Sequence, residues 1–468
     1  MSKRIVMKFG GSSVGNANAI RQATSLARAA YDEGNEVVVV VSAMKGVTDM
    51  LINGARNAVG GEEHAAEEAK QALWQKHVEA VEALFSQSTH QVLGNIEAEL
   101  SRFAHLVSAT TVLGEVTTRA MDFISSLGER FSAQLVAAYL SATYGPAEAV
   151  IANEIVVTDR NFGNANPLLE ATGERVRARI VPLLAAGTIP VVTGFMGATE
   201  EGIVTTLGRG GSDYTAAILG HALDADEIWI WSDVDGVLTA DPRVVPDAHP
   251  IEKLSYQEAA ELAYFGAKVL HPKTVRPAVK KGIPIRMLNT FNPSYPGTWI
   301  SKTSNGAAVK AVTSVSHVAE VTVAGSGMLG VPGVSARLFG AVAKLGVSVL
   351  MISQASSEQS ICSVVLEKES QDVVAALEQE FERELHYGDI DRITPKTGVV
   401  IIAIVGAAMR GQYGLAGKLF TALGDNKINV LTIAQGSSEY NISLVVEQKD
   451  AKRAIQVIHD AFGLGRQA

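Results

Sequence analysis

The sequence contains a single cysteine, Cys362, among 468 residues. One cysteine excludes an internal disulfide framework and any cysteine-rich metal site. Long apolar runs are also missing: no stretch is long enough to span a membrane, and the residues after Lys3 and Arg4 enter a short strand without the apolar core of a secretory signal. The sequence therefore predicts a cytoplasmic protein with no membrane partner.

Positive charge is scarce as well. The chain has 40 Lys and Arg against 49 Asp and Glu, a formal net charge of −9 at pH 7. This balance argues against nucleic acid as a partner and against an anionic membrane surface. An anionic substrate would need a local cluster of Lys and Arg. Hydrophobic residues at 47% and charged residues at 19% are typical of a folded soluble protein, and the length allows two or three domains.

The common phosphate, metal and hydrolase motifs are absent from the sequence. No segment has the P-loop spacing, and Gly208-Arg209-Gly210-Gly211-Ser212-Asp213 lacks the third glycine of a dinucleotide fingerprint. There is no HExxH helix and no serine elbow, and the ten histidines show no metal-ligand spacing. We therefore predict no metal site built from the protein's own ligands.

A glycine-rich stretch is present, Thr205-Thr206-Leu207-Gly208-Arg209-Gly210-Gly211-Ser212-Asp213-Tyr214. Gly202-Ile203-Val204 before it is predicted to end a strand, and the apolar residues after it predict a helix capped by Ser212 or Asp213. Glycines in such a turn let the backbone approach a ligand, and a helix start favours an anion. Arg209 offers a planar fork for a carboxylate or phosphate, although a solvated arginine on a capped turn is the simpler interpretation.

The first forty residues predict a parallel α/β sheet, because a strand, a glycine turn, a helix and a second apolar strand follow one another. These segments are Ile5–Phe9, Gly10-Gly11-Ser12-Ser13, Asn18–Tyr31 and Val37–Val41. Ser42–Thr48 lies just past the second strand, where open α/β sheets bind ligands.

The next two hundred residues, roughly, continue the same domain. Glu62–Phe103 is rich in Ala and Glu and predicts a helical insertion, and Gly128-Glu129-Arg130 is expected to interrupt a further helical region. Pro190–Phe195 and Ile228–Trp231 predict two more strands. The domain is expected to end near residue 300, before a linker at 301–307.

Beyond the linker the chain repeats itself. Ile352–Glu358 returns as Ile433–Glu439, and Gln354 maps onto Gln435 at an offset of 81 residues. Each copy predicts an α+β module with a glycine turn. The modules could serve dimerisation alone, but Gln354 and Gln435 can hydrogen-bond an amino acid and the glycine turns expose amides, which favours an effector site. The same offset relates Gly325, Met328, Gly330, Gly333 and Phe339 to Gly406, Met409, Gly411, Gly414 and Phe420.

Four cations stand beside predicted turns in this acidic chain: Lys8, Arg209, Arg243 and Lys268. Each alone is more often a solvated surface charge. Together they favour a polyanion such as ATP, because phosphoryl transfer depends on positioning and on neutralising the moving group.

A second interpretation concerns Trp229–Leu238. A strand that ends in Asp-x-Asp-Gly is similar to the first motif of haloacid-dehalogenase-type phosphatases, in which Asp233 would be the nucleophile and Asp235 the acid. No convincing acidic pair follows to hold magnesium, and the interpretation leaves the preceding residues unexplained.

Taken together, the motifs resemble those of the aspartokinases, which have an amino-acid-kinase domain and two ACT regulatory modules. The resemblance implies an α/β class, with a three-layer α/β/α domain and a mostly parallel sheet at 1–300, followed by two ferredoxin-like α+β ACT modules at 310–395 and 396–468. It covers nearly the whole length. The segments that carry it are Lys8–Val14, Ser42–Thr48, Thr205–Tyr214, Trp231–Arg243 and Phe265–Pro272.

The family's activity is ATP-dependent phosphorylation of the side-chain carboxylate of L-aspartate, with Mg²⁺ on the phosphates. A carboxylate nucleophile is already ionised at neutral pH and needs no general base. By resemblance, Lys8, Arg209 and Asp213 would be catalytic. Aspartate would contact Ser42, Thr48, Glu129, Phe195, Arg209, Ser212 and Asp213. The nucleotide would contact Lys8, Gly10, Gly11, Ser232, Asp233, Asp241, Arg243 and Lys268.

Three expectations remain from the resemblance. An amino-acid effector, threonine in preference to lysine, would bind the ACT modules, and the chain would form a homodimer or a dimer of dimers. The chain is expected to be monofunctional, without a homoserine dehydrogenase half, and an amino-acid sensor that has lost catalysis is the alternative. Leu238 stands where the family commonly has tyrosine, which puts an aromatic nucleotide contact there in doubt. The effector residues would be Met328, Gly333, Gln354, Ser357, Glu358 and Gln435.

Overall fold

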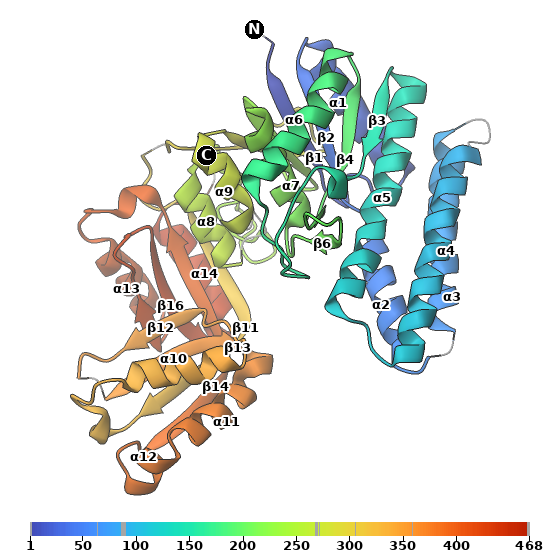
Figure 1. Cartoon of the computed structure of the whole chain (residues 1–468). Helices are drawn as coiled ribbons and strands as arrows, with labels where there is room; N and C mark the ends of the chain where they lie inside the picture. Colours follow the sequence, from blue (N-terminus) through green and yellow to red (C-terminus); the bar gives the residue numbers. More distant parts are fainter. Residues whose placement is uncertain are drawn as a thin grey trace. The chain divides into compact units, whose positions relative to one another are not determined.

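The computed structural model describes residues 2–465, except 63, 86–89, 267–269, 271, 305 and 358 (Figure 1). The contacts divide the chain into two compact units. The first consists of Met1–Val237, Glu252–Tyr256 and Leu270–Ser304, and the second of Leu238–Ile251, Gln257–Val269 and Asn305–Ala468. The first unit contains an eight-stranded sheet and the second a six-stranded sheet.

The sheet of the first unit has the strand order β3-β4-β2-β1-β7-β9-β10-β8. All neighbouring pairs are parallel except β9 with β10. The central strands are runs of Val and Ile buried on both faces, as helices on both sides require. The predicted mostly parallel α/β sheet is confirmed. The strands are β1 (Arg4–Phe9), β2 (Glu36–Val41), β3 (Ala147–Val150), β4 (Ile189–Thr193), β7 (Glu227–Ser232), β8 (Lys253–Ser255), β9 (Ile285–Asn289) and β10 (Thr298–Ser301).

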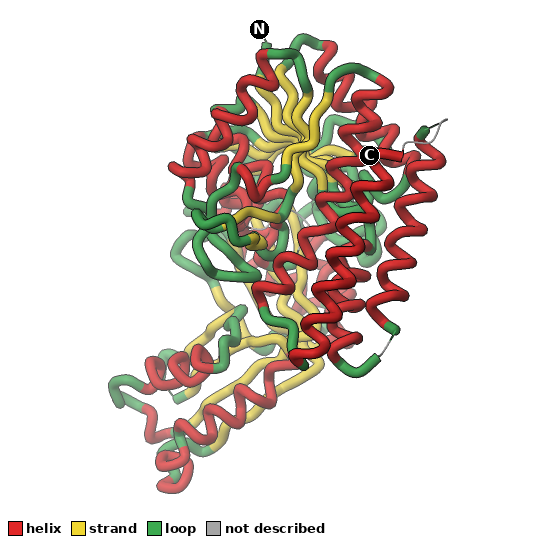
Figure 2. Tube along the Cα trace, turned by 45° about the vertical axis from the view of Figure 1, so that its right-hand side comes forward, coloured by secondary structure: helices red, strands yellow, loops and turns green. Residues whose placement is uncertain are grey.

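Helices cover both faces of this twisted sheet, as Figure 2 shows. A small hairpin of β5 (Met196–Ala198) and β6 (Val204–Thr206) precedes α7. The predicted helical insertion is confirmed, because α3 and α4 pack with α2 and α5 through a shared apolar core. The helices of this unit are α1 (Ala17–Asp32), α2 (Val47–Val59), α3 (Ala65–Leu84), α4 (His90–Leu113), α5 (Thr118–Thr143), η1 (Ala152–Glu154), α6 (Leu169–Ala185), α7 (Gly211–Leu223) and α9 (Pro272–Lys281). Helix α8 (Tyr256–Tyr264) belongs to the second unit from Gln257 onward.

The expected helix interruption at Gly128-Glu129-Arg130 is wrong. These residues lie within α5, which is continuous from Thr118 to Thr143. A Cβ on Gly128 would lie 2.7 Å from the Ala43 Cβ and 3.1 Å from Val47 Cγ1. Gly128 is therefore a site of close packing between α5 and the segment after β2, and it does not break the helix.

Two further expectations around the glycine-rich stretch need correction. Val204 begins strand β6, which runs to Thr206, so it does not end the strand. The helix that follows starts after Gly210, which has φ 71°, and neither Ser212 nor Asp213 caps it. A left-handed glycine makes this sharp entry without a side-chain cap.

The second unit repeats its elements at the predicted offset of 81 residues. Its antiparallel sheet has the order β12-β13-β11-β14-β16-β15. Both copies have the order strand, 3₁₀ turn, helix, strand, strand, helix, which confirms a repeated α+β module, and the first copy has two further short helices. The first copy is β11 (Ala311–Ala324), η2 (Ser326–Met328), α10 (Val334–Lys344), β12 (Met351–Gln354), β13 (Ser360–Leu366), η3 (Glu367–Glu369), α11 (Ser370–Glu380) and α12 (Glu382–Tyr387). The second is β14 (Arg392–Val405), η4 (Ala407–Met409), α13 (Leu415–Asp425), β15 (Thr432–Ala434), β16 (Asn441–Glu447) and α14 (Gln448–Ala461).

The long strands β11 and β14 are shared between the two copies. Residues 318–324 of β11 pair with β13, and residues 399–405 of β14 pair with β16. The other half of each strand completes the sheet of the other copy, because 311–315 pair with 401–405 and 320–324 with 392–396. Two register irregularities, between Val315 and Val318 and between Val318 and Glu320, interrupt the pairing of β11 with β14. Among the described residues, none of the helices combines the length and apolar character needed to cross a bilayer.

Candidate active site

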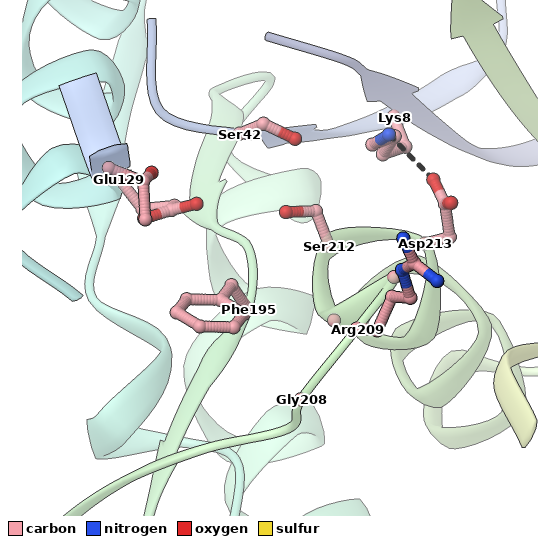
Figure 3. Close-up of a pocket in the computed structure, with 11 residues that line it drawn as sticks. Lys8, Ser42, Glu129, Phe195, Gly208, Arg209, Ser212 and Asp213 are labelled. Carbon is pink, nitrogen blue, oxygen red and sulfur yellow. Dashed lines mark ion pairs between the residues drawn. The ribbon is translucent and has the colours of Figure 1, made fainter. Parts of the chain in front are cut away.

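A cavity of about 420 Å³ opens in the first unit at the carboxyl edge of the sheet (Figure 3). β1 lies between β2 and β7, and β2 pairs with β4, all in parallel, so the turns after these strands meet at one edge. The cavity contains all seven residues expected to contact aspartate. Its lining is Lys8, Ser42, Thr48, Glu129, Phe195, Gly208, Arg209, Gly210, Gly211, Ser212 and Asp213.

Lys8 is the last but one residue of β1 and forms an ion pair with Asp213 in the first turn of α7. The Lys8 Nζ lies 2.6 Å from Asp213 Oδ1, and both side chains are less than one-fifth exposed. An ammonium group has three donors, so one carboxylate contact leaves it able to meet a second anion. The pair therefore fixes a positive charge at the wall of the cavity.

Glu129 projects from α5 into the same cavity and is only 4% exposed. Its Oε2 atom makes no hydrogen bond to any residue that the structure describes. Burial raises the pKa of Glu129 to about 8, although the backbone N–H of Ala43 and the charge of Lys8 favour the ionised form. A buried acid whose oxygen has no hydrogen-bond partner in the protein is suited to a cationic group of a ligand, such as an ammonium.

Arg209 lies in the glycine turn between β6 and α7, and its side chain is exposed. Figure 3 shows Arg209 on the side of the cavity opposite Glu129. Gly208 and Gly210 both have positive φ, 77° and 71°, a conformation that other residues rarely adopt. The turn thus places the Arg209 guanidinium at one side of the cavity, and Glu129 from α5 lies at the other side.

Phe195 follows β4 and has φ 69°, which is unusual for a residue with a side chain. Two hydrogen bonds hold it there: its N–H donates to Thr215 Oγ1 at 3.0 Å, and its C=O accepts from the Leu207 N–H at 2.8 Å. A Cβ on Gly211 would lie 2.6 Å from the Phe195 ring. Backbone strain of this kind concentrates at functional sites.

Gly194 provides a test of this packing. A Cβ there would lie 2.6 Å from Ser212 Oγ and 2.9 Å from Ser212 Cα, so Gly194→Ala should displace the first turn of α7. We expect a loss of about 1–3 kcal/mol of unfolding free energy and a clear loss of activity. Thermal unfolding and a kinase assay measure both. Gly94→Ala is the control, because a Cβ at Gly94 in α4 meets no atom within 4 Å; similar losses in both variants would contradict the packing argument.

Asp122 is a buried acid that the sequence did not single out. It lies on α5, is 2% exposed, and binds the Gly163 and Thr206 backbone with its carboxylate. Burial raises the pKa of Asp122, and the hydrogen bonds from Thr206 and Gly163 oppose that rise. Because it stands in a helical stretch without a motif, no sequence signal identifies it.

The residues expected to contact the nucleotide are distributed over both units. Gly10 and Gly11 follow β1, Ser232 ends the neighbouring strand β7, and the exposed Asp233 comes directly after it. The Gly10 N–H donates to the Trp231 C=O at 3.1 Å, which joins the two turns. Asp241 and Arg243 belong to the second unit, where they form an ion pair at 2.6 Å, and Lys268 lies outside the described residues.

The expected effector residues lie in the second unit. Met328, Gly333 and Gln354 line a cavity of about 400 Å³ at the start of α10. Ser357 is on an exposed turn and does not line it, and Glu358 lies outside the described residues. Gln435 is exposed in the second copy of the repeat. Within the described ranges, no three His, Cys, Asp or Glu residues are arranged to hold a metal ion.

The α/β sheet with a cation-lined cavity at its carboxyl edge defines a small-molecule kinase fold, and comparison with known proteins agrees. Residues 3–289 match the model of the amino acid kinase family, and residues 321–381 and 402–462 each match an ACT domain. Aspartokinase 3 of Arabidopsis thaliana is 37% identical over 98% of this chain and 81% of its own length. The chain belongs to the amino acid kinase family and, within it, to the aspartokinases.

Two crystal structures of E. coli aspartokinase III are similar over 98% of this chain. The complex with aspartate and ADP, called the R-state, has a TM-score of 0.83 at 29% identity and is covered over 99% of its length. The complex with lysine and aspartate, called the T-state, has a TM-score of 0.79 at 30% identity and is covered in full. The chain spans about half the length of the bifunctional aspartokinase/homoserine dehydrogenases it matches, such as that of Zea mays, which is 38% identical over 98% of this chain and 50% of its own length.

Proposed function

We propose that the protein transfers the γ-phosphoryl group of ATP to the side-chain carboxylate of L-aspartate, giving 4-phospho-L-aspartate and ADP. The observation that carries the proposal is the single cavity that gathers Lys8, Arg209 and Glu129 around a space of small-molecule size. The crystallised relative that binds aspartate and ADP supports the same substrates here. The reaction would be the first step toward lysine, threonine and methionine.

Each charged group of aspartate has an oppositely charged side chain in the cavity. Arg209 is a fork for the α-carboxylate, and Glu129 accepts the α-ammonium. Asp213 assists at the ammonium and holds Lys8, while Ser42, Thr48 and Ser212 offer hydroxyl groups and Phe195 closes one wall. The side-chain carboxylate of aspartate is then left to face Lys8.

The chemistry requires alignment more than acid–base catalysis. The side-chain carboxylate is ionised at neutral pH, so its oxygen attacks the γ-phosphorus without a general base, the new O–P bond forms, and the bond to ADP breaks. Lys8 neutralises charge on the moving group, and the Gly10 and Gly11 turn allows a phosphate to approach the backbone. Neighbouring Ser232 and Asp233 extend this nucleotide side.

Three further residues, Asp241, Arg243 and Lys268, would contact the nucleotide. Mg²⁺ would neutralise the phosphates of ATP. The ion would be bound mainly through the phosphate oxygens of the nucleotide.

An ADP-release assay across aspartate, glutamate, N-acetylglutamate and carbamate tests the proposal. Turnover with aspartate alone is expected. Absence of turnover with aspartate would contradict it, and amino-acid binding without ATP consumption would favour the sensor alternative. The structure argues against the phosphatase interpretation, in which Asp235 would be the catalytic acid. Asp235 Oδ1 already accepts hydrogen bonds from Asn289 Nδ2 at 2.8 Å and from Asn292 Nδ2 at 3.0 Å.

We further propose a cytoplasmic enzyme, at least a homodimer, with a catalytic domain at 1–300 and ACT modules at 310–395 and 396–468. The cavity lined by Met328, Gly333 and Gln354 would take an end-product amino acid. We keep threonine as the favoured effector over lysine, from the Gln-x-Ser-Ser-Glu turns, with Ser357, Glu358 and Gln435 as further contacts. The lysine complex of the E. coli relative makes lysine the necessary comparison.

Gln354→Ala tests the effector site. Loss of one amide hydrogen bond should raise the effector concentration for half-inhibition by up to about tenfold, with little change in uninhibited turnover. Threonine and lysine are titrated separately in the kinase assay. Gln371→Ala, an exposed glutamine on α11, is the control; an unchanged inhibition curve for Gln354→Ala would exclude that side chain as a contact.

A further inference from the structure

Helix α5 carries two buried acids, Asp122 and Glu129, which are seven residues apart. Seven residues make nearly two helical turns, so both side chains lie on one face, about 10 Å apart along the axis. Glu129 lines the active-site cavity directly. Asp122 does not line it, and instead binds the backbone that leads into the Arg209 turn.

Asp122 uses both carboxylate oxygens for this purpose. Oδ2 accepts the backbone N–H of Gly163 at 2.9 Å and of Thr206 at 3.0 Å, and Oδ1 accepts the Thr206 hydroxyl at 2.7 Å. Thr206 ends β6, three residues before Arg209. Three hydrogen bonds to one buried carboxylate are strong, because an ionised acceptor in a dry site shortens and strengthens each bond.

The loop at 159–166 is held to the same strand end. The Ala165 N–H donates to the Thr206 C=O at 2.9 Å. A Cβ on Gly208 would lie 2.8 Å from Asn164 Oδ1, so this loop stands directly behind the glycine turn. Asp122 therefore fixes the strand that enters the Arg209 turn and the loop that supports it from behind.

We propose that Asp122 is a positioning residue, which sets the distance between Arg209 and Glu129 and thereby the affinity for the amino-acid substrate. The inference rests on the proposed function, in which Arg209 and Glu129 hold the α-carboxylate and α-ammonium groups. One rigid helix contributes the acid at one end of the substrate and holds the turn at the other end. Lys8 belongs to β1, and the described ion pair of Lys8 and the described hydrogen bonds of Asp122 share no residue, so we expect phosphoryl transfer from bound aspartate to depend little on Asp122.

The test is steady-state kinetics of the full chain with Asp122→Ala. The KM for aspartate should rise at least about tenfold, while kcat and the KM for ATP stay within about threefold, since misplacing a binding group by a fraction of an ångström is costly. Asp122→Asn should restore the KM to within about threefold of the unchanged protein. Its oxygen can accept both backbone N–H groups, and its amide nitrogen can donate to the Thr206 hydroxyl, which is also an acceptor.

Ser125→Ala is the matched control. Ser125 is buried on the same helix, and its hydroxyl donates within the helix to the Met121 C=O at 2.8 Å. It should leave the KM for aspartate unchanged. Thermal unfolding of every variant separates a local from a global effect.

Three outcomes would overturn the inference: an unchanged aspartate KM in Asp122→Ala, equal changes in kcat and both KM values, or no rescue by Asp122→Asn. If Asp122→Ala does not fold, Thr206→Val serves instead. Thr206→Val deletes the hydrogen bond from the Thr206 hydroxyl to Asp122, so the KM for aspartate should rise about threefold or more. Thr206→Ser keeps the hydroxyl and should leave this KM at the value of the unchanged protein. An unchanged KM in Thr206→Val would contradict the inference. If the unchanged protein does not turn over aspartate, the proposed function fails, whereas an unchanged KM beside normal wild-type turnover sinks this inference alone.

Discussion

Lys8→Ala should lower the turnover number with aspartate and ATP by about 10²–10³-fold, the usual effect of removing one preorganised charge contact to a transition state. The side chain is held by Asp213 at 2.6 Å inside the cavity, so its charge is in place before the reaction begins. A positioned charge needs no reorganisation when negative charge develops on the transferring oxygens. The loss should therefore fall mainly on kcat, as measured by ADP release at saturating substrates.

Lys3→Ala is the matched control for that prediction. Lys3 precedes the same strand and also pairs with an acid, Glu227, at 2.5 Å, but its side chain is 54% exposed at the opposite edge of the sheet. It should leave kcat close to the value of the unchanged protein. A near-normal kcat in Lys8→Ala would mean that Lys8 does not contact the transferring phosphoryl group.

The sequence was sufficient to predict where the cavity residues gather. Lys8, Ser42 and Phe195 each stand at the carboxyl end of an apolar run, and parallel strands place these ends on one edge. The repeat offset also predicted the second copy of the α+β module, because an unbroken register of glycines and apolar residues cannot persist over two unrelated folds.

Features that depend on distant contacts could not be predicted in this way. Gly128 looks like a helix breaker until Ala43, far away in sequence, is found against it. The pairing of β11 with β14 across the repeat, and the two register irregularities within it, are marked by no local pattern. Asp122 is an ordinary helical acid in sequence, and only the backbone N–H groups of Gly163 and Thr206 distinguish it.

The protonation state of Glu129 should change when a ligand with an ammonium group binds in the cavity. Glu129 is buried, and burial raises its pKa to about 8. Its Oε2 has no hydrogen-bond partner among the described residues. An ammonium group placed against it would favour the ionised form. Aspartate binding near pH 7 should therefore release a proton from Glu129, which calorimetry in buffers of different ionisation enthalpy can measure.

Glu129→Gln is the second prediction with a large effect, and it concerns stability as well as binding. The pKa of Glu129 is about 8 in the folded protein, against the ordinary value of 4.5 expected in the unfolded chain. Between these values the folded protein keeps a proton that the unfolded chain has lost. The free energy of unfolding therefore falls as pH rises through this window, by up to about 1.4 kcal/mol per pH unit from this group. Glu129→Gln should remove that slope in urea unfolding between pH 5 and 8, and be the more stable protein at pH 8.

The same substitution should weaken aspartate binding by about 10²–10³-fold, because an ammonium group would be left in a buried site without its carboxylate. Glu97→Gln, an exposed position on α4, should change neither the pH slope nor the affinity. The two effects must occur together if one buried carboxylate causes both. If the pH slope is lost but the affinity for aspartate is unchanged, Glu129 is a buried acid of the fold that does not contact the substrate. If the pH slope is unchanged, the Glu129 carboxylate is not the group that causes the pH dependence of the unfolding free energy.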